Sequence, residues 1–269
     1  MKILLITGDH PRHLYLADTF SKTDLDIKWV IEKREPLIPV EKNISKTIKK
    51  LYEFHFHKRA QVEKNFFFES GELAKKKLKL VHEIKKAKEI SSELKKICDK
   101  FQPGLLIAYG SGIINDQILD RENMLKWNVH LGLSPWYRGG ATLFWPSYLL
   151  EPEFTGITVH EMTKMIDAGP IIHQQAAELN PEDGIHENAC RLTKSFCDLF
   201  PAKLQLAIKK KIVLKGIPQI VNGRNFTQKL WKPEMLKIVY EFFNDRINKY
   251  CIDNNLSRKV KIQSILDDE

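Results

Sequence analysis

The order of short apolar runs at the amino end constrains the fold most strongly. Lys2–Thr7 is an apolar run of strand length, and Gly8–Pro11 follows it as a turn. Pro at the first position suits the start of a helix, which we expect to continue to about Lys22. Ile27–Ile31 is a second apolar run. A strand, a helix and a strand in this order predict the opening of an α/β domain with a parallel sheet.

Later segments continue this pattern. Strands are predicted at Leu105–Ala108, Trp127–His130, Thr155–His160 and Gly169–Gln175, and a long helix at Glu187–Lys210. We therefore expect a catalytic domain over residues 1–210.

The pattern changes after residue 210. Ile217–Val221, Arg224–Phe226 and a helix over Pro233–Lys249 predict a small C-terminal subdomain at 211–269. An apolar stripe on that helix would either pack within the chain or form a homodimer contact. Its members are Leu236, Val239, Phe242 and Phe243.

The segment from residue 33 to 70 is less regular. Pro36 and Pro39 interrupt any element there. A helix is expected around His55–Ala60. His55 and His57 are two positions apart and so do not share a helical face, which disfavours a metal site. The run Phe66–Phe68 is expected in the core.

The Lys-rich stretch Glu72–Ile97 is predicted as one amphipathic helix, because its apolar residues fall close to helical spacing. These are Leu73, Leu80, Ile84, Ala87, Leu94 and Ile97. Its Lys residues would then form the solvated face.

Net charge is +9, from 43 Lys and Arg against 34 Asp and Glu. Such a chain attracts anions: nucleic acid, a membrane surface or a phosphorylated substrate. Much of the excess is Lys between Lys75 and Lys100, and a nucleic-acid surface would show more Arg with interleaved aromatics. We therefore disfavour a nucleic-acid partner.

The chain shows no signal for membranes or secretion. No apolar run is long enough to span a bilayer, and the first strand is too short for a signal peptide. We expect a cytoplasmic protein without a membrane partner. The cysteines form no C-x-x-C pair, which favours reduced, buried thiols over a metal site. They are Cys98, Cys190, Cys197 and Cys251.

Three polar residues form a candidate catalytic group. Asn128 and His130 are two positions apart at the end of a predicted strand, so both can point to one face. Active residues of an open parallel sheet gather at the carboxyl ends of its strands. Asp167 lies in a loop before the next strand and can return to the same cleft.

An amide, an imidazole and a carboxylate suit acyl transfer without a covalent intermediate. The amide of Asn128 and a protonated His130 would donate to a developing oxyanion. Asp167 would raise the imidazole pKa and help to remove a proton from an attacking amine. From residue types alone a structural role stays open, with His130 bonded to a backbone carbonyl and the other two residues holding turns.

Four motifs in fixed order carry a resemblance. The chain reads N-V-H, S-P-W-Y-R-G, T-G-I-T-V-H and D-A-G-P-I-I between Gly104 and Gln174. In this it resembles the formyltransferases that use 10-formyltetrahydrofolate. The resemblance implies a Rossmann-like α/β fold, a mostly parallel sheet flanked by helices, without a dinucleotide. It also implies Asn128, His130 and Asp167 as catalytic residues, and 10-formyltetrahydrofolate as co-substrate.

The resemblance also implies a pterin site in two loops. One follows the third strand of the family's sheet and the other precedes the catalytic Asp. The residues implied are Ala108, Tyr109, Gly110, Ser111, Gly112, Ile113, Ile114, Met162, Lys164 and Ile166. A tight turn without ligand is the alternative for Tyr109–Gly112.

The acceptor amine is less constrained. The run Y-R-G-G-A-T-L-F-W-P resembles sugar N-formyltransferases of cell-surface glycan pathways such as O-antigen and lipopolysaccharide, so we expect a nucleotide-linked amino-deoxy sugar. The turn G-D-H-P-R-H departs from the phosphate turn of glycinamide ribonucleotide enzymes. About fifty residues follow Gly216, fewer than the barrel of the tRNA branch. Alternatives are methionyl-tRNA, glycinamide ribonucleotide, or a non-catalytic folate- or nucleotide-binding module.

Basic and aromatic residues near these motifs are candidates for acceptor binding. A helix N-terminus with basic residues suits phosphate, a guanidinium pairs with it, and aromatic rings flank a base or sugar. The candidates are His10, Arg12, His13, Trp136, Tyr137, Arg138, Gly139, Thr142, Phe144 and Trp145. A core position is the alternative for Phe144 and Trp145, and a structural ion pair for Arg138.

Overall fold

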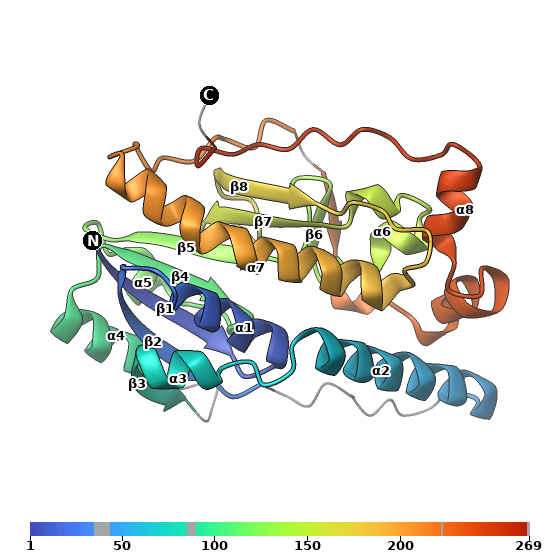
Figure 1. Ribbon diagram of the computed structural model, residues 1–269, viewed down its shortest axis with the longest axis horizontal. Coiled ribbons are helices and arrows are strands. Elements are labelled where there is room, and N and C mark those ends of the chain that lie inside the picture. The colour runs from blue at the N-terminus through green and yellow to red at the C-terminus, as the bar shows by residue number, and fades with distance from the viewer. Residues whose placement is uncertain (35–43, 85–89, 222, 268–269) are drawn as a thin grey trace.

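The computed structural model describes residues 1–34, 44–84, 90–221 and 223–267 (Figure 1). Its centre is a seven-stranded sheet in the order β3-β2-β1-β4-β5-β7-β8. The strands are β1 (Lys2–Gly8), β2 (Asp26–Glu32), β3 (Lys79–Ile84), β4 (Leu105–Tyr109), β5 (Leu125–His130), β7 (Gly156–Glu161) and β8 (Ile171–Ala176). A separate pair joins β6 (Tyr137–Gly139) to β9 (Arg224–Phe226).

The sheet is mostly parallel, as predicted. Strands β1 to β5 pair in parallel, whereas β7 is antiparallel to both β5 and β8. The carboxyl ends of β1, β4 and β5 therefore lie along one edge, and the chain order places the motif-bearing loops there.

Helices cover both faces, which explains the continuous apolar runs in the strands. Ile3 and Leu5 contribute to one core, and Leu4 and Ile6 to the other. The first core contains side chains from α1 (Pro11–Phe20), α3 (Glu72–Lys77) and α7 (Ile185–Lys209). The second contains side chains from α4 (Ile90–Phe101) and α5 (Asp116–Leu119). The result is an α/β domain of three layers.

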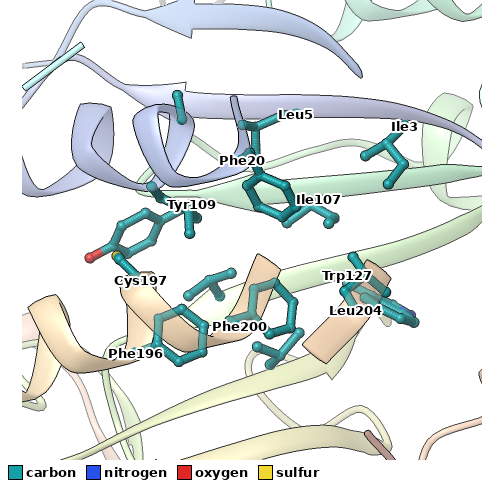
Figure 2. Close-up of a cluster of buried hydrophobic side chains, with 14 of the residues drawn as sticks. Ile3, Leu5, Phe20, Ile107, Tyr109, Trp127, Phe196, Cys197, Phe200 and Leu204 are labelled. Atoms are coloured by element: carbon teal, nitrogen blue, oxygen red, sulfur yellow. The ribbon is translucent and has the colours of Figure 1, made fainter. Parts of the chain in front are cut away.

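Aromatic rings fill the first core (Figure 2). Phe196 and Phe200 stack with ring centroids 5.0 Å apart, and Phe20 meets Phe200 edge-on at 6.0 Å. Trp127 lies fully buried beneath Leu204 of α7 in the same cluster. Burial of each large side chain stabilises the fold by about 1.5–3 kcal/mol, so α7 is held firmly over the sheet.

The prediction of one helix over Glu72–Ile97 is wrong. Helix α3 ends at Lys77, Leu78 is extended at φ −87° and ψ 148°, and β3 then pairs with β2. The run K-L-V-H-E-I has the length of a strand and contains the β-branched residues Val and Ile, and the open edge of β2 offers unpaired backbone groups that a strand satisfies. Tertiary pairing therefore decides against the helical period.

The helix predicted over Pro233–Lys249 is also wrong. A 3-10 turn at Pro233–Met235 and a π-helix at Ile238–Phe242 precede α8 (Ile247–Asp253). Asn244 and Asp245 break the helix with φ of 48° and 54°, a conformation that short polar side chains tolerate.

The C-terminal segment packs on the rest of the chain. Leu236 and Val239 share a buried cluster with Tyr137, and Leu266 lies in the first core. Ser264 bonds to His173 of β8 at 2.8 Å. A domain boundary at residue 210 stays a prediction.

Of the remaining structural predictions, some are confirmed, one is wrong and one lies outside the described residues. The helix α2 (Lys46–Phe66) contains His55–Ala60 as predicted. Phe67 is buried, but Phe68 is 69% exposed, so its predicted core position is wrong. All four cysteines are unpaired and buried, as predicted. Pro36 and Pro39 lie outside the described residues. No helix in the described part of the chain is long and apolar enough to span a bilayer.

Candidate active site

The structure brings Asn128, His130 and Asp167 together at the carboxyl end of β5. Asp167 Oδ2 lies 3.4 Å from His130 Nδ1. Its other oxygen, Oδ1, accepts from the Asn128 amide at 3.5 Å. The two β5 side chains share a face, and Asp167 reaches them from the loop between β7 and β8.

The Asp167 backbone is held from several sides. It adopts a left-handed φ of 49°, a conformation that Asp tolerates better than most residues other than Gly. Gln219 Nε2 donates to the carbonyl oxygens of Asp167 at 3.0 Å and of Gly169 at 2.7 Å. The Gly139 N–H donates to Asp167 Oδ2 at 3.0 Å. These bonds fix the carboxylate beside His130.

His160 is a fourth polar member that the sequence reasoning did not assign. It lies opposite Asn128 in the β5–β7 register. Its Nε2 lies 3.3 Å from Asp167 Oδ1 and 3.3 Å from Asn128 Nδ2. The final H of T-G-I-T-V-H was the available signal.

His130 is placed between two acceptors. Its Nε2 lies 3.0 Å from the Tyr137 carbonyl oxygen, and its Nδ1 faces Asp167. A neutral ring can donate to only one of them, whereas an imidazolium donates to both.

The charge state of His130 reflects opposing effects. Burial has the largest effect and lowers its pKa, while the Asp167 carboxylate and the Tyr137 carbonyl raise it, leaving the pKa below its ordinary value. Asp167 thus acts in the predicted direction, but burial outweighs it. The neutral ring is the resting form at pH 7.

Asp167 is ionised at neutral pH. Burial raises its pKa, but the hydrogen bond from His160, the electrostatic influence of the nearby imidazoles and the Gly139 N–H together lower it to about 2. The site therefore holds a buried carboxylate beside an imidazole and an amide, a set that can move a proton and bind a developing oxyanion.

A cavity of about 310 Å³, the smaller cavity, is lined by two members of the trio, Asn128 and Asp167. Asn128, His160 and Asp167 form one end of it. The rest of its lining is Arg34, Ser111, Gly112, Ile113, Ile114, Leu119, Met162, Thr163, Met165 and Ile166. Ile113, Met165 and Ile166 are largely exposed apolar side chains, which is typical of a ligand-binding rim.

Six of the ten residues implied for the pterin line this cavity. They are Ser111, Gly112, Ile113, Ile114, Met162 and Ile166. Ala108 and Tyr109 are instead buried in opposite cores. Gly110 has a φ of 67° and packs its backbone against His13. Lys164 points to solvent and pairs with Asp116 at 3.6 Å. Thr163 and Met165 line the cavity from the predicted loop over Met162–Asp167, and Arg34 and Leu119 line it without having been predicted.

A second cavity of about 560 Å³, the larger cavity, begins at Leu131, directly after His130. Its lining comes from α1, α2, α7, the loop before α6 (Trp145–Tyr148) and the C-terminal segment. The residues are Arg12, Tyr52, His55, Phe56, Arg59, Glu63, Leu131, Ala141, Thr142, Leu143, Phe144, Ile185, His186, Ala189, Cys190, Thr193, Gln228 and Trp231.

Three of the ten residues predicted for the acceptor line the larger cavity: Arg12, Thr142 and Phe144. Seven do not, because they take other contacts. They are His10, His13, Trp136, Tyr137, Arg138, Gly139 and Trp145.

His13 is buried between His10 and Tyr109. Trp136 packs on Phe154, and Trp145 is buried on Phe226. These positions favour a packing role.

Two further residues predicted for the acceptor, Tyr137 and Gly139, contact the trio through backbone groups. Tyr137 supplies the carbonyl at His130, and its hydroxyl bonds to Glu151. Gly139 supplies the N–H at Asp167. The Arg138 Nε is buried without a hydrogen-bond partner in the described part of the chain.

The residues that the structure describes contain no group of His, Cys, Asp and Glu side chains that could hold a metal ion.

Comparison with known proteins defines the class. The Formyl transferase family model matches residues 22–204, most of the chain. The chain therefore belongs to the formyl transferase family.

Curated relatives of similar sequence are methionyl-tRNA formyltransferases. One from Prochlorococcus marinus (strain MIT 9515) is 34% identical over 143 residues, which cover 53% of this chain and 38% of that protein. Another, from strain MIT 9312, is 26% identical over 218 residues, 66% of this chain and 65% of that protein. The first of these matches thus spans well under half of the relative.

Solved structures share the fold at lower identity. A formyltransferase from Anoxybacillus kamchatkensis, in complex with a UDP-linked 4-formamido sugar and tetrahydrofolate, is 18% identical with a TM-score of 0.53, over 93% of this chain and 97% of that one. A 4-N formyltransferase from Francisella tularensis is 17% identical with a TM-score of 0.53, over 85% and 76%. At this identity the likeness establishes the fold alone.

Proposed function

We propose that the protein transfers a formyl group from 10-formyltetrahydrofolate to the amine of a nucleotide-linked amino-deoxy sugar. The observation that carries this proposal is the trio of Asn128, His130 and Asp167, set between two cavities in a chain of the formyl transferase family. Each cavity takes one of the two substrates.

The smaller cavity takes the folate. Asn128, His160 and Asp167 line it, and the loop residues Ser111–Ile114 and Met162–Thr163, which also line it, carry backbone polar groups that suit the polar edge of a pterin. Its apolar rim suits the rest of the ligand. Tetrahydrofolate in the Anoxybacillus structure supports this choice.

In the proposed mechanism the neutral amine attacks the formyl carbon, and the new C–N bond gives a tetrahedral adduct, whose bond to folate N10 breaks when the carbonyl reforms. Asn128 donates to the oxyanion of this adduct. His130 receives the proton that Asp167 takes from the attacking amine, and then donates to the oxyanion as well. Asp167 accepts the amine proton directly or through water, and the proton returns to N10 of the leaving folate.

The larger cavity takes the acceptor. Its aromatic members, Tyr52, Phe56, Phe144 and Trp231, offer flat apolar faces to a base or sugar. The UDP-linked formamido sugar in a structural relative that covers nearly the whole chain supports the sugar reading.

Methionyl-tRNA is the second candidate acceptor, favoured by the names of the curated relatives. Exposed Lys75, Lys76, Lys95 and Lys96 lie on α3 and α4 at the amino-terminal half of the sheet. Salt-sensitive binding of tRNA would favour this candidate.

The cytoplasm is the proposed compartment, because four buried, unpaired cysteines suit a reducing environment. A homodimer stays a prediction.

The experiment is a thermal-shift panel followed by turnover assays. The panel holds dTDP- and GDP-linked 4-amino-4,6-dideoxy sugars, glycinamide ribonucleotide and methionyl-tRNA, each with 10-formyltetrahydrofolate. A true acceptor stabilises the protein and consumes the folate. A response to tRNA alone would replace the sugar proposal.

A further inference from the structure

A compact cluster of charges lines the larger cavity. Arg12 begins α1, and Arg59 and Glu63 lie one turn apart on α2. Arg12 Nη1 pairs with Glu63 Oε1, and Arg59 Nε donates to the same oxygen at 2.8 Å. The side chains of Arg12 and Glu63 are 12% and 3% exposed, and that of Arg59 is 27% exposed. Two guanidiniums therefore share one carboxylate oxygen.

The cluster carries an excess positive charge. Glu63 is the only carboxylate that pairs with either guanidinium in the described part of the chain. Burial lowers the pKa of His13 and raises the pKa of both Tyr109 and Cys190, so these neighbours are neutral at pH 7. Two cations against one anion leave about one positive charge in a largely buried place.

An uncompensated charge away from water costs free energy. Such a charge is expected where a bound ligand of opposite charge balances it. Clusters of titratable groups with shifted pKa values in a cavity are therefore candidate functional sites. Guanidinium groups bind phosphoryl oxygens in two-bond geometry. We propose that Arg12 and Arg59 bind the phosphoryl oxygens of the acceptor, with Glu63 holding the two guanidiniums in place. This rests on the proposed function for the identity of the larger cavity as the acceptor site.

The charge cluster and Leu131, the residue after His130, line different parts of the larger cavity. Arg12 follows β1, whereas Leu131 follows β5, and β4 lies between these strands. Two inter-strand spacings separate the strand ends by roughly 10 Å. In Figure 1, α2 extends beyond the carboxyl end of β1. An acceptor that spans the cavity must therefore carry its phosphoryl group well away from its amine.

The aromatic residues of the cavity complete this picture. Tyr52 and Phe56 lie on the same helix as Arg59, and their rings approach Trp231 at 6.1 and 6.2 Å. Phe144 meets Trp231 at 5.9 Å and leads toward Leu131. Guanidinium groups and flat aromatic faces in one cavity suit a nucleoside diphosphate joined to a sugar.

The test is titration calorimetry with pyrophosphate, dTDP, UDP and GDP as probes. Arg59→Gln removes one cation and should weaken the best wild-type probe by roughly tenfold or more. Glu63→Gln removes the competing anion and should tighten binding. Lys64→Gln is the matched control, because Lys64 is an exposed cation on the same helix. Its affinity should match wild type. The subsite is overturned when wild type binds none of the probes, or when Arg59→Gln and Glu63→Gln both bind as wild type does.

Steady-state kinetics separates this inference from the proposed function. With an active acceptor, Arg59→Gln should raise KM for the acceptor about tenfold and leave kcat within a few-fold, because Arg59 does not touch the reacting atoms. Equal KM in wild type and Arg59→Gln would remove the subsite and leave formyl transfer intact. Arg59-dependent nucleotide binding without turnover of any acceptor would keep the subsite and remove the proposed function.

Discussion

At the residue scale, His130 is the group on which the proposed chemistry depends most. Its ring nitrogens face the Tyr137 carbonyl and Asp167. His130→Ala removes a donor to the oxyanion, so kcat should fall by about 10²–10⁴-fold. Stopped assays of formyl transfer measure this directly. Near-normal turnover by a folded variant would contradict the assigned role.

Gln219 is a positioning residue in this account. Its side-chain amide donates to the backbone carbonyl oxygens of Asp167 and Gly169. Gln219→Met keeps the size of the side chain but loses both bonds, so Asp167 should shift and kcat should fall by about 10–100-fold, with KM little changed. The matched control is Gln61→Met, at an exposed position on α2.

A purely structural role for Gln219 would not move the histidine titrations. Displacement of the Asp167 carboxylate should change the pKa of His130, which the Asp167 carboxylate raises, as measured by NMR of the imidazole protons. Unchanged titrations together with unchanged kcat would contradict the positioning role.

At the element scale, the strands that carry the site are predictable from sequence, because buried parallel strands read as short apolar runs. The prediction of one helix over Glu72–Ile97 is wrong because two patterns compete there. The apolar residues fit helical spacing, while K-L-V-H-E-I also suits a strand, and pairing with the edge of β2 favours the strand. The prediction of one helix over Pro233–Lys249 is wrong because Asn244 and Asp245 adopt left-handed conformations. Asp245 is held there by contacts with distant elements.

Asp245 shows how such a distant contact works. Its carboxylate accepts from the Ile185 N–H at the start of α7 at 2.9 Å, and from Lys58 of α2 at 2.6 Å. Asp245→Ala leaves both donors without this partner, so the free energy of unfolding should fall by about 1–3 kcal/mol. Urea denaturation measures it.

The control for Asp245 is Asp253→Ala, which removes an exposed carboxylate that, within the described ranges, pairs only with Lys249. That change should alter the free energy of unfolding by less than about 0.5 kcal/mol. Equal stability of the two variants would contradict a tertiary role for Asp245.

At the scale of the whole molecule, the site divides into what local motifs reveal and what only the fold assembles. Asn128, His130 and Asp167 lie within motifs of recognisable spacing. Glu63 and Gln219 carry no such signal, because each bonds to a residue about fifty positions away in the chain, and Arg59 joins the cluster through Glu63. No pattern along the chain predicts those pairings.

Buried histidines should make the whole molecule acid-sensitive. Burial lowers the pKa of His55 to about 3 and that of His173 to about 4, against about 6.5 in an unfolded chain. The unfolded state therefore binds protons first, and stability is lost as pH falls below about 6.5. Each of the two groups contributes a loss of about 2 kcal/mol by pH 5.

Urea unfolding at pH 7 and pH 5 checks this. The free energy of unfolding should be lower at pH 5, and His173→Asn should reduce the difference between the two values. Equal stability at both pH values would contradict the burial of these histidines as neutral groups.

The central claim is that the trio moves a formyl group onto the amine of a nucleotide-linked sugar. The most direct measurement is mass spectrometry of that amino sugar after incubation with 10-formyltetrahydrofolate and either wild type or His130→Ala. The account predicts that wild type converts the sugar to the product heavier by one CO, with release of tetrahydrofolate, and that the variant does so at least about a hundredfold more slowly. Formylation of methionyl-tRNA with the sugar left unmodified, or equal rates for the two proteins, would contradict it.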